Sequence, residues 1–591
     1  MHLTLIDWGI IVAYFAVSLG VGLYYRDRAS RSLTDYFISG RALPWWLAGT
    51  SMVATTFAAD TPLAVQGLVA KNGLAGNWFW WAFALGGMIT VFLYARLWRR
   101  AEVVTDVELV ELRYGGKPAA FLRGFRALYI SLLVNSIIIG WVTVAMLKVL
   151  KYTVFAETAA MSGSWDWWLI VAMLLMVGVY STLSGLWGVV WTDFLQFGVA
   201  MFGFIVLAVI AVARLGGMDA MQAQVAANFP GGDQVFSFLP DFSAENPWMP
   251  IDIFLIMLFI QWWATWYPGA EPGGGGYIVQ RMASAKDERH SLLATLWFQI
   301  AHYTVRPWPW LILSFAALAM FPNLRSLPDP GVGMPMIIRE IAPVGIRGLI
   351  LVAFFAAFMS TIATQINWGA SYLVNDFYAR FIRPGSDDRQ LTRMSRLASV
   401  LVLTLGGIAT WLMRDFSVDQ AWKFLAALGA GTGAVFMLRW YWWRINAWTE
   451  IVAMVASLVF FVIVAEVVER NEYRMAIVAA LTIAAWLIAT FVTKPESPEI
   501  LQRFYRKVRP GGPGWKPVAA AAPDVSADRN LGTSILAALF ATGIVYLTLP
   551  GVGHIIFGHW LAAAATLAGA ALCAVIMVAL LKRIGWATIV H

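Results

Sequence analysis

The chain has 591 residues, of which 60% are hydrophobic and only 13% are charged, and its mean hydropathy is +0.69. A water-soluble protein cannot bury that much apolar surface, so the composition indicates a polytopic α-helical membrane protein. The net charge of +8 does not require nucleic acid as a partner, because Lys and Arg also collect on the inner side of membrane proteins. The single cysteine, Cys573, excludes an intramolecular disulfide and a cysteine-based metal cluster.

Mostly apolar segments long enough to cross about 30 Å of hydrocarbon recur along nearly the whole chain. They predict about fifteen transmembrane helices. Their approximate bounds are 4–25, 46–70, 77–98, 126–150, 165–184, 186–212, 251–269, 291–320, 348–380, 395–413, 420–441, 447–469, 474–493, 533–550 and 556–582. The first segment has no secretory cleavage site, so we expect it to be retained as a helix.

An odd number of helices places the two termini on opposite sides of the membrane. With the N-terminus outside and the C-terminus in the cytoplasm, every strongly basic connection falls on the inner side. These connections contain Arg26, Arg28, Arg31, Arg41, Arg96, Arg99, Arg100, Arg113, Lys117, Arg380, Arg383, Arg389, Arg393, Arg396, Lys494, Arg503, Arg506, Lys507, Arg509 and Lys516. We therefore predict a multi-pass protein of the cell membrane, plasma or inner.

Polar residues, proline or glycine interrupt two of the predicted helices. The interruptions are SMVATTFAADTPLAVQG at 51–67 and QWWATWYPGAEPGGGGYIVQR at 261–281. Irregular backbone at membrane depth is tolerated only where it lines a cavity or is buried in protein. The interruptions lie five helices apart, as expected if two five-helix repeats each begin with a discontinuous helix. A proline kink would explain either one alone, so the matched placement carries the argument.

This pattern divides the chain into seven parts. They are an N-terminal extra helix with an inner loop (1–45), a first five-helix repeat (46–212), an outer connection (213–250), a second five-helix repeat (251–445), two peripheral helices (446–493), a basic cytoplasmic linker (494–532) and two C-terminal helices (533–591).

The stretch FFAAFMSTIATQ at 354–365 places Ser360 and Thr361 side by side in an apolar helix. Such hydroxyls usually bond to their own backbone or to a neighbouring helix. The preceding alanines allow another backbone to approach, however, and neutral oxygens suit a hard monovalent cation. Carbonyls released near Ala54 and Phe57 would complete its coordination shell.

Four motifs, in this order and spacing, resemble the sodium:solute symporter family over residues 4–445. They are DYFISGRALPWWLAGTSMVATTFAADTPL at 35–63, YSTLSGLWGVVWTDFLQ at 180–196, YIVQRMASAKDERHS at 277–291 and AAFMSTIATQINWGASYLVNDFYARF at 356–381. The resemblance implies an all-α, LeuT-type fold of 5+5 inverted repeats, with one extra N-terminal helix and additional C-terminal helices. It also implies solute uptake coupled to sodium.

By position, the resemblance implies a sodium site made of backbone and hydroxyl oxygens. These belong to Ala54, Phe57, Ala357, Ser360 and Thr361. It places Asp193 on the inner exit path of sodium or at a second sodium site. A carboxylate inside a predicted helix needs a partner or an aqueous path, and the plainer interpretation is a helix-end carboxylate near the inner interface.

The solute side departs from the sugar-transporting relatives. Those relatives carry a lysine at His302, polar residues at Trp80 and Trp81, and a glutamine at Thr61, so we do not expect a plain hexose ligand. The predicted contacts are Asp60, Thr61, Trp80, Trp81, Asn135, Thr265, Tyr267 and His302. An interhelical hydrogen bond for Asn135 and a satisfied buried histidine for His302 are the structural alternatives.

Arg306, in VRPWPW, lies roughly midway along a predicted helix and cannot deprotonate, so it needs an acceptor. Carbonyls freed by Pro307 and Pro309 would supply one. The alternatives are a role in binding a solute carboxylate and a role in closing an outer gate.

Together these features predict a secondary active transporter, not an enzyme, that takes up a small organic solute with sodium by alternating access. We expect no organic cofactor. The expected partners are the solute, sodium as coupling ion and the lipid bilayer. One alternative is a sodium-independent channel or facilitator with GGGG at 273–276 as its filter. The other is an intramembrane enzyme using His302, although the chain has no HExxH or GxSxG motif.

Overall fold

A computed structural model describes residues 2–29, 37–156, 164–245, 247–267, 269–528 and 530–584. Within these ranges the regular elements are helices, and the only β-type pairing is an isolated bridge between Leu43 and Ala285. The prediction of an all-α chain is confirmed for this part of the sequence.

Twenty-seven α-helices follow one another along these ranges, and several are halves of one interrupted segment. The first part contains α1 (Leu5–Ala29), α3 (Trp45–Thr56), α4 (Asp60–Asn72), α5 (Trp78–Trp81), α6 (Phe83–Ile89), α7 (Ala95–Ala101), α8 (Leu109–Arg113), α9 (Gly116–Leu128), α10 (Asn135–Tyr152), α11 (Ser164–Arg214) and α12 (Met218–Asn228). The middle contains α13 (Ile251–Ile256), α14 (Trp262–Ala264), α15 (Gly276–Ser284), α16 (Glu288–Ile300), α17 (Pro307–Met320), α18 (Gly333–Ile341), α19 (Ile346–Ser371), α20 (Asp388–Met413), α21 (Val418–Leu428) and α22 (Thr432–Leu438). The last part contains α23 (Ala447–Ala465), α24 (Asn471–Val492), α25 (Pro498–Val508), α26 (Lys516–Ala519), α27 (Leu531–Ile556) and α28 (Trp560–Arg583).

Nine helices of the described ranges are long and apolar enough to cross a membrane, or ten if α21 and α22, bent by 57°, form one span. The nine are Leu74–Ala101, Gly116–Tyr152, Leu186–Arg214, Ile346–Ile382, Asp388–Met413, Ala447–Ala465, Asn471–Val492, Leu531–Ile556 and Trp560–Arg583. Three shorter apolar helices are Leu5–Val21, Trp165–Gly178 and Ile251–Ala264. This count is lower than fifteen partly because breaks divide predicted spans into shorter helices. The chain is nevertheless a multi-pass membrane protein.

The first break, residues 57–59, lies inside the first predicted interruption and separates α3 from α4. Phe57 leaves the helical region with φ −92° and ψ 81°, and its N–H donates to the carbonyls of Val53 and Ala54, both at 3.0 Å. The chain becomes helical again at Asp60. This turn therefore brings carbonyl groups and the start of α4 to one place inside the protein.

The second break, residues 265–275, lies inside the second predicted interruption and separates α14 from α15. Its freed backbone groups are paired with the bend between α21 and α22, because Gly431 N donates to Ala264 O at 2.7 Å and Trp266 N donates to Gly429 O at 3.3 Å. Two irregular segments thus satisfy one another away from lipid. Gly276, which opens α15, has φ +53°, a conformation that favours glycine.

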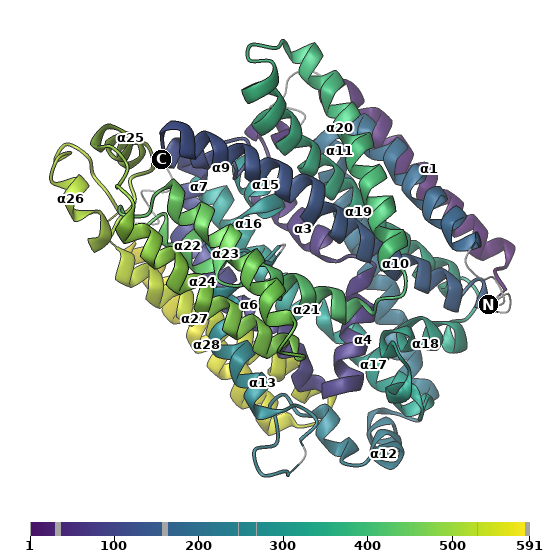
Figure 1. Cartoon of the computed structure of the whole chain (residues 1–591). Helices are drawn as coiled ribbons and strands as arrows, with labels where there is room; N and C mark the ends of the chain where they lie inside the picture. Colours follow the sequence, from purple (N-terminus) through teal and green to yellow (C-terminus); the bar gives the residue numbers. More distant parts are fainter. Residues whose placement is uncertain are drawn as a thin grey trace.

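We call the helices α3–α22, which contain both breaks, the body of the protein. Segments outside this body cover its sides. Tyr546 of α27 donates its hydroxyl to the carbonyl of Trp81 at 3.0 Å, which attaches the C-terminal helices to the body. The predicted linker 494–532 contains ordered helices, and α25 buries Phe504 and Tyr505 against Trp515. Figure 1 shows α25 and α26 at one end of the molecule and α12 at the opposite end.

Candidate functional site

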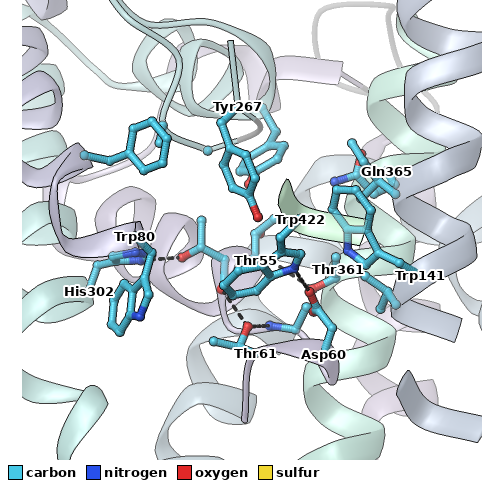
Figure 2. Close-up of a pocket in the computed structure, with 18 of the residues that line it drawn as sticks. Thr55, Asp60, Thr61, Trp80, Trp141, Tyr267, His302, Thr361, Gln365 and Trp422 are labelled. Atoms are coloured by element: carbon cyan, nitrogen blue, oxygen red, sulfur yellow. Dashed lines mark hydrogen bonds between the residues drawn. The ribbon is translucent and has the colours of Figure 1, made fainter. Parts of the chain in front are cut away.

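A central cavity lies between the two breaks, and the centres of water-sized spheres can occupy about 80 Å³ of it. Its walls also include parts of α10, α19 and α21 and the segment between α16 and α17. The tryptophan, tyrosine and phenylalanine side chains that line it are Trp80, Phe83, Trp141, Tyr267, Tyr277, Tyr303 and Trp422. Its polar lining residues are Thr55, Thr56, Asp60, Thr61, His302, Arg306, Thr361 and Gln365. Figure 2 shows Trp80 and His302 on one side of this cavity and Trp141 and Gln365 on the other.

Five of the eight predicted solute contacts line the central cavity. They are Asp60, Thr61, Trp80, Tyr267 and His302. Arg306 lines it as well. Segments up to 362 residues apart in sequence therefore meet at one place, as the Asp60–Trp422 pair illustrates.

The other three predicted contacts lie outside the lining. Asn135 donates from Nδ2 to the carbonyl of Gln365 at 2.7 Å and so links α10 to α19. This is the interhelical hydrogen bond that we named as the alternative to a solute contact. The hydroxyl of Thr265 donates to Gln261 O at 2.9 Å, within its own segment. Neighbouring residues of a helix point about 100° apart, so Trp80 faces the cavity and Trp81 does not. Trp81 contacts Phe238 instead.

Asp60 opens α4 and is 3% exposed. Its Oδ2 accepts a hydrogen bond from Trp422 Nε1 at 2.7 Å, whereas Oδ1 has no hydrogen-bond partner. Asp60 also makes no ion pair with a cationic side chain of the described ranges. One carboxylate oxygen is thus left for whatever occupies the cavity.

Arg306 and His302 form a network with Thr56 at the end of α3. Arg306 Nη1 donates to Val53 O at 3.2 Å and to the Thr56 hydroxyl at 3.1 Å, and Nη2 lies 3.2 Å from His302 Nε2. Because a guanidinium only donates, His302 Nε2 acts as acceptor and Nδ1 carries the proton, 3.0 Å from Thr56 Oγ1. The carbonyl that Arg306 uses therefore comes from α3, and the expectation of carbonyls freed by Pro307 and Pro309 is wrong.

The predicted sodium ligands gather where α19 meets the first break. Thr361 donates its hydroxyl to Thr55 O at 2.9 Å, next to Ala54, and Ser360 donates to Asp193 Oδ1 at 2.5 Å. Ser360 and Thr361 are 2% and 3% exposed, so neither faces lipid. Ala357 lies one helical turn before Thr361 on the same helix face.

Asp193 belongs to a buried charge cluster that the sequence did not reveal. It is fully buried within α11, so the interpretation as a helix-end carboxylate is wrong. Ser51 donates to its Oδ2 at 2.5 Å, and Arg281 Nη2 lies 3.8 Å from the same oxygen. Arg281 also donates to Thr364 at 2.8 Å. The cluster thus joins α3, α11, α15 and α19 directly beside Ser360.

Sequence reasoning missed several residues of the site. Gln365 follows Thr361 by four residues, and residues four apart lie on the same face of a helix. This spacing could have identified Gln365 as a site residue. Arg281 stands in the quoted YIVQR motif. Trp422 had no distinguishing signal among 31 tryptophans. Glu271, in the second break, is not among the lining residues; it is 5% exposed, and neither of its carboxylate oxygens has a hydrogen-bond partner.

A model of the sodium:solute symporter family matches residues 36–460 of this chain. The chain belongs to the sodium:solute symporter family. A sodium/glucose cotransporter of Vibrio parahaemolyticus is 27% identical over 480 residues, which cover 78% of this symporter and 84% of that protein. A sodium/mannose cotransporter of Bos taurus is 25% identical over 483 residues, covering 75% and 76% of the two chains.

A solved structure of a Na+-coupled sialic acid symporter, in a substrate-bound outward-open state, has the same fold. It superimposes with a TM-score of 0.65 at 22% identity and covers 84% of this symporter and 99% of that chain. The family consists of sodium-coupled transporters, which rules out the enzyme alternative and identifies sodium as the coupling ion. Among the described residues, no group of three or more His, Cys, Asp or Glu side chains is arranged to hold a metal ion.

Proposed function

We propose that this protein couples the entry of sodium to the uptake of a small organic solute by alternating access. One observation carries the proposal: the Thr361 hydroxyl meets the Thr55 carbonyl at 2.9 Å, and Thr55, Thr361 and Asp60 all line the solute cavity. The ion ligands and the solute contacts therefore share the first break. An ion bound there stabilises the backbone arrangement that the solute needs, which is the basis of coupling.

The sodium ligands that we propose are the backbone oxygens of Ala54, Phe57 and Ala357 and the hydroxyls of Ser360 and Thr361. Each hydroxyl keeps lone pairs while it donates its own proton, so the present hydrogen bonds do not block coordination. Asp193, bonded to Ser360, adds a negative charge next to the ion. We place it on the inner exit path or at a second sodium site.

The architecture that we propose is a 5+5 inverted repeat within about fifteen spans, with the N-terminus outside and the C-terminus in the cytoplasm. The positions of the two breaks support it, because α4 and α15 each resume a segment interrupted at depth. One inward-moving charge gains ~2.3 kcal/mol per 100 mV, so a single sodium ion drives useful accumulation. The channel alternative is less well supported, since Gly273 O already accepts from Trp98 at 2.8 Å.

The experiment that tests this proposal measures sodium binding first and uptake second. The purified protein is titrated with NaCl at constant ionic strength in KCl, and tryptophan fluorescence and thermal stability are followed. We expect a saturable, sodium-specific response in the wild type. The Ser360→Ala/Thr361→Ala variant should need at least about tenfold more sodium, because two oxygen ligands worth at least ~1.4 kcal/mol together are lost.

Thr410→Ala is the matched control, since this buried hydroxyl on α20 bonds only to its own helix, at Gly406 O. It should retain the wild-type response. Proteoliposomes then show whether labelled solutes accumulate against a gradient only with sodium and a negative interior potential. Unchanged sodium dependence in the double variant rejects the site, and uptake that never exceeds equilibrium rejects symport.

A further inference from the structure

Arg306 is a permanent cation without a negative partner. It is 1% exposed, its three hydrogen-bond acceptors are the neutral groups Val53 O, Thr56 and His302, and its Nε has no partner. It forms no ion pair with any carboxylate of the described ranges. A buried cation is costly unless an anion reaches it, and Arg306 borders the central cavity.

Asp60, which lines the same cavity, is a buried carboxylate that makes no ion pair with a cationic side chain of the described ranges. Its Oδ2 accepts a hydrogen bond from the neutral Trp422 indole, and its Oδ1 has no hydrogen-bond partner. The cavity is thus lined by one negative and one positive side chain that form no ion pair with each other.

The charges and the aromatic faces that line the cavity favour one kind of solute over others. A polyol needs many paired hydroxyls, whereas Trp80, Phe83 and Tyr303 offer mainly aromatic faces. A simple anion would leave Asp60 unpaired and repelled, and a simple cation would do the same to Arg306. A molecule with both charges neutralises both groups at once.

We propose that the solute is a small zwitterion of the α-amino-acid class, with its carboxylate on Arg306 and its ammonium on Asp60. The ammonium then lies beside the Trp422 and Trp141 rings, which attract a cation. The aromatic lining receives an apolar side chain. This inference rests on the proposed function, because it names the solute that sodium drives.

The test compares an amino acid with its two halves. Neutral L-amino acids are screened with the purified protein in NaCl for thermal stabilisation and tryptophan quenching. The best amino acid is then compared with its deaminated acid, its decarboxylated amine and D-glucose. We expect each half-molecule to bind at least about thirtyfold more weakly, because it leaves one buried charge unpaired, and glucose not to bind.

Two variants separate direct pairing from general damage. Asp60→Asn should weaken the amino acid strongly and the deaminated acid hardly at all, so the advantage of the amino group disappears. Arg306→Gln should do the reverse and remove the advantage of the carboxylate. Damage to the fold would lower every affinity alike, and Thr410→Ala should change none of them.

The outcomes distinguish this inference from the proposed function. Sodium-dependent binding of glucose in place of amino acids, equal binding of the half-molecules, or no amino acid bound at all would overturn the inference and leave sodium symport standing. Amino acids that bind equally well in NaCl and KCl would overturn the coupling to sodium and leave the zwitterion site standing.

Discussion

Asp193 and Ser360 connect the proposed ion site to α11 and α15, two helices that carry none of the five predicted sodium ligands. Asp193 accepts from Ser51 on α3 and Ser360 on α19, and Arg281 on α15 balances its charge. The Asp193–Arg281 pair is fully buried on both sides. A small movement of α15 therefore changes the environment of Ser360.

Removing one charge of this pair should destabilise the protein more than removing both. Asp193→Asn leaves the Arg281 guanidinium without its carboxylate and should cost ~3–5 kcal/mol, with a lower melting temperature in KCl. Arg281→Gln should cost a similar amount. The double variant Asp193→Asn/Arg281→Gln should recover part of the loss, because no buried charge is left unpaired.

Thermal unfolding of the four proteins in one detergent forms a double-mutant cycle. Losses that simply add would show that the two charges do not interact. In NaCl, the Asp193→Asn variant should also bind sodium more weakly, since the negative charge beside Ser360 is gone.

At the scale of helices, α3 and α16 approach so closely that one position must be glycine. A Cβ at Gly49 would lie 2.6 Å from Ala294 O and 2.9 Å from the Trp297 ring. Small residues allow membrane helices to pack backbone to backbone. Here the close approach holds α3, which ends at the first break, against the helix that leads to His302.

Gly49→Ala should therefore lower stability by ~1–3 kcal/mol, because α3 and α16 must separate or the Trp297 ring must move. Gly198→Ala on α11 is the control, since nothing lies within 4 Å of its Cβ position. That change should be neutral or slightly stabilising, because alanine is the better helix former. Melting temperatures measured in the same detergent decide the matter, and equal values for both variants would contradict close packing at Gly49.

Local patterns predicted the two breaks and the paired hydroxyls of Ser360 and Thr361. Proline and glycine interrupt a helix at their own position, and adjacent hydroxyls can be read directly from the sequence. Contacts such as Trp422 with Asp60 depend on the path of the whole chain, and no local pattern identified them. The segment 494–532 was predicted only as a basic cytoplasmic linker, because its basic composition dominated. Its buried apolar residues Leu501, Phe504, Tyr505 and Val508 nevertheless follow the spacing of one helix face.

At the scale of the whole molecule, ion pairs connect separate helices on both predicted sides of the membrane. Lys71 of α4 lies 2.7 Å from Asp419 of α21, on the predicted outer side. On the predicted inner side, Glu111 of α8 accepts from Arg123 at 2.7 Å and from Arg380 at 3.0 Å. Partial burial acts to raise the pKa of Glu111, but these two arginines outweigh it, so its pKa lies below the ordinary value. The inner link is therefore ionised at neutral pH.

In alternating access, weakening the outer link should increase access to the cavity from outside, and weakening the inner link should decrease it. In a Cys573→Ser background, Thr61→Cys places a reporter thiol in the cavity, and an impermeant thiol reagent is added outside proteoliposomes that hold the protein in its native orientation. Lys71→Gln should speed labelling about two- to fivefold, because a partly exposed ion pair is worth up to ~1 kcal/mol. Glu111→Gln should slow it, because the inward-open state gains population at the expense of the outward-open one. Lys582→Gln on the peripheral helix α28 should leave the rate unchanged. Acceleration by both link variants would mean that the two sides open independently, as in a channel, and that the cavity is not accessible from one side at a time.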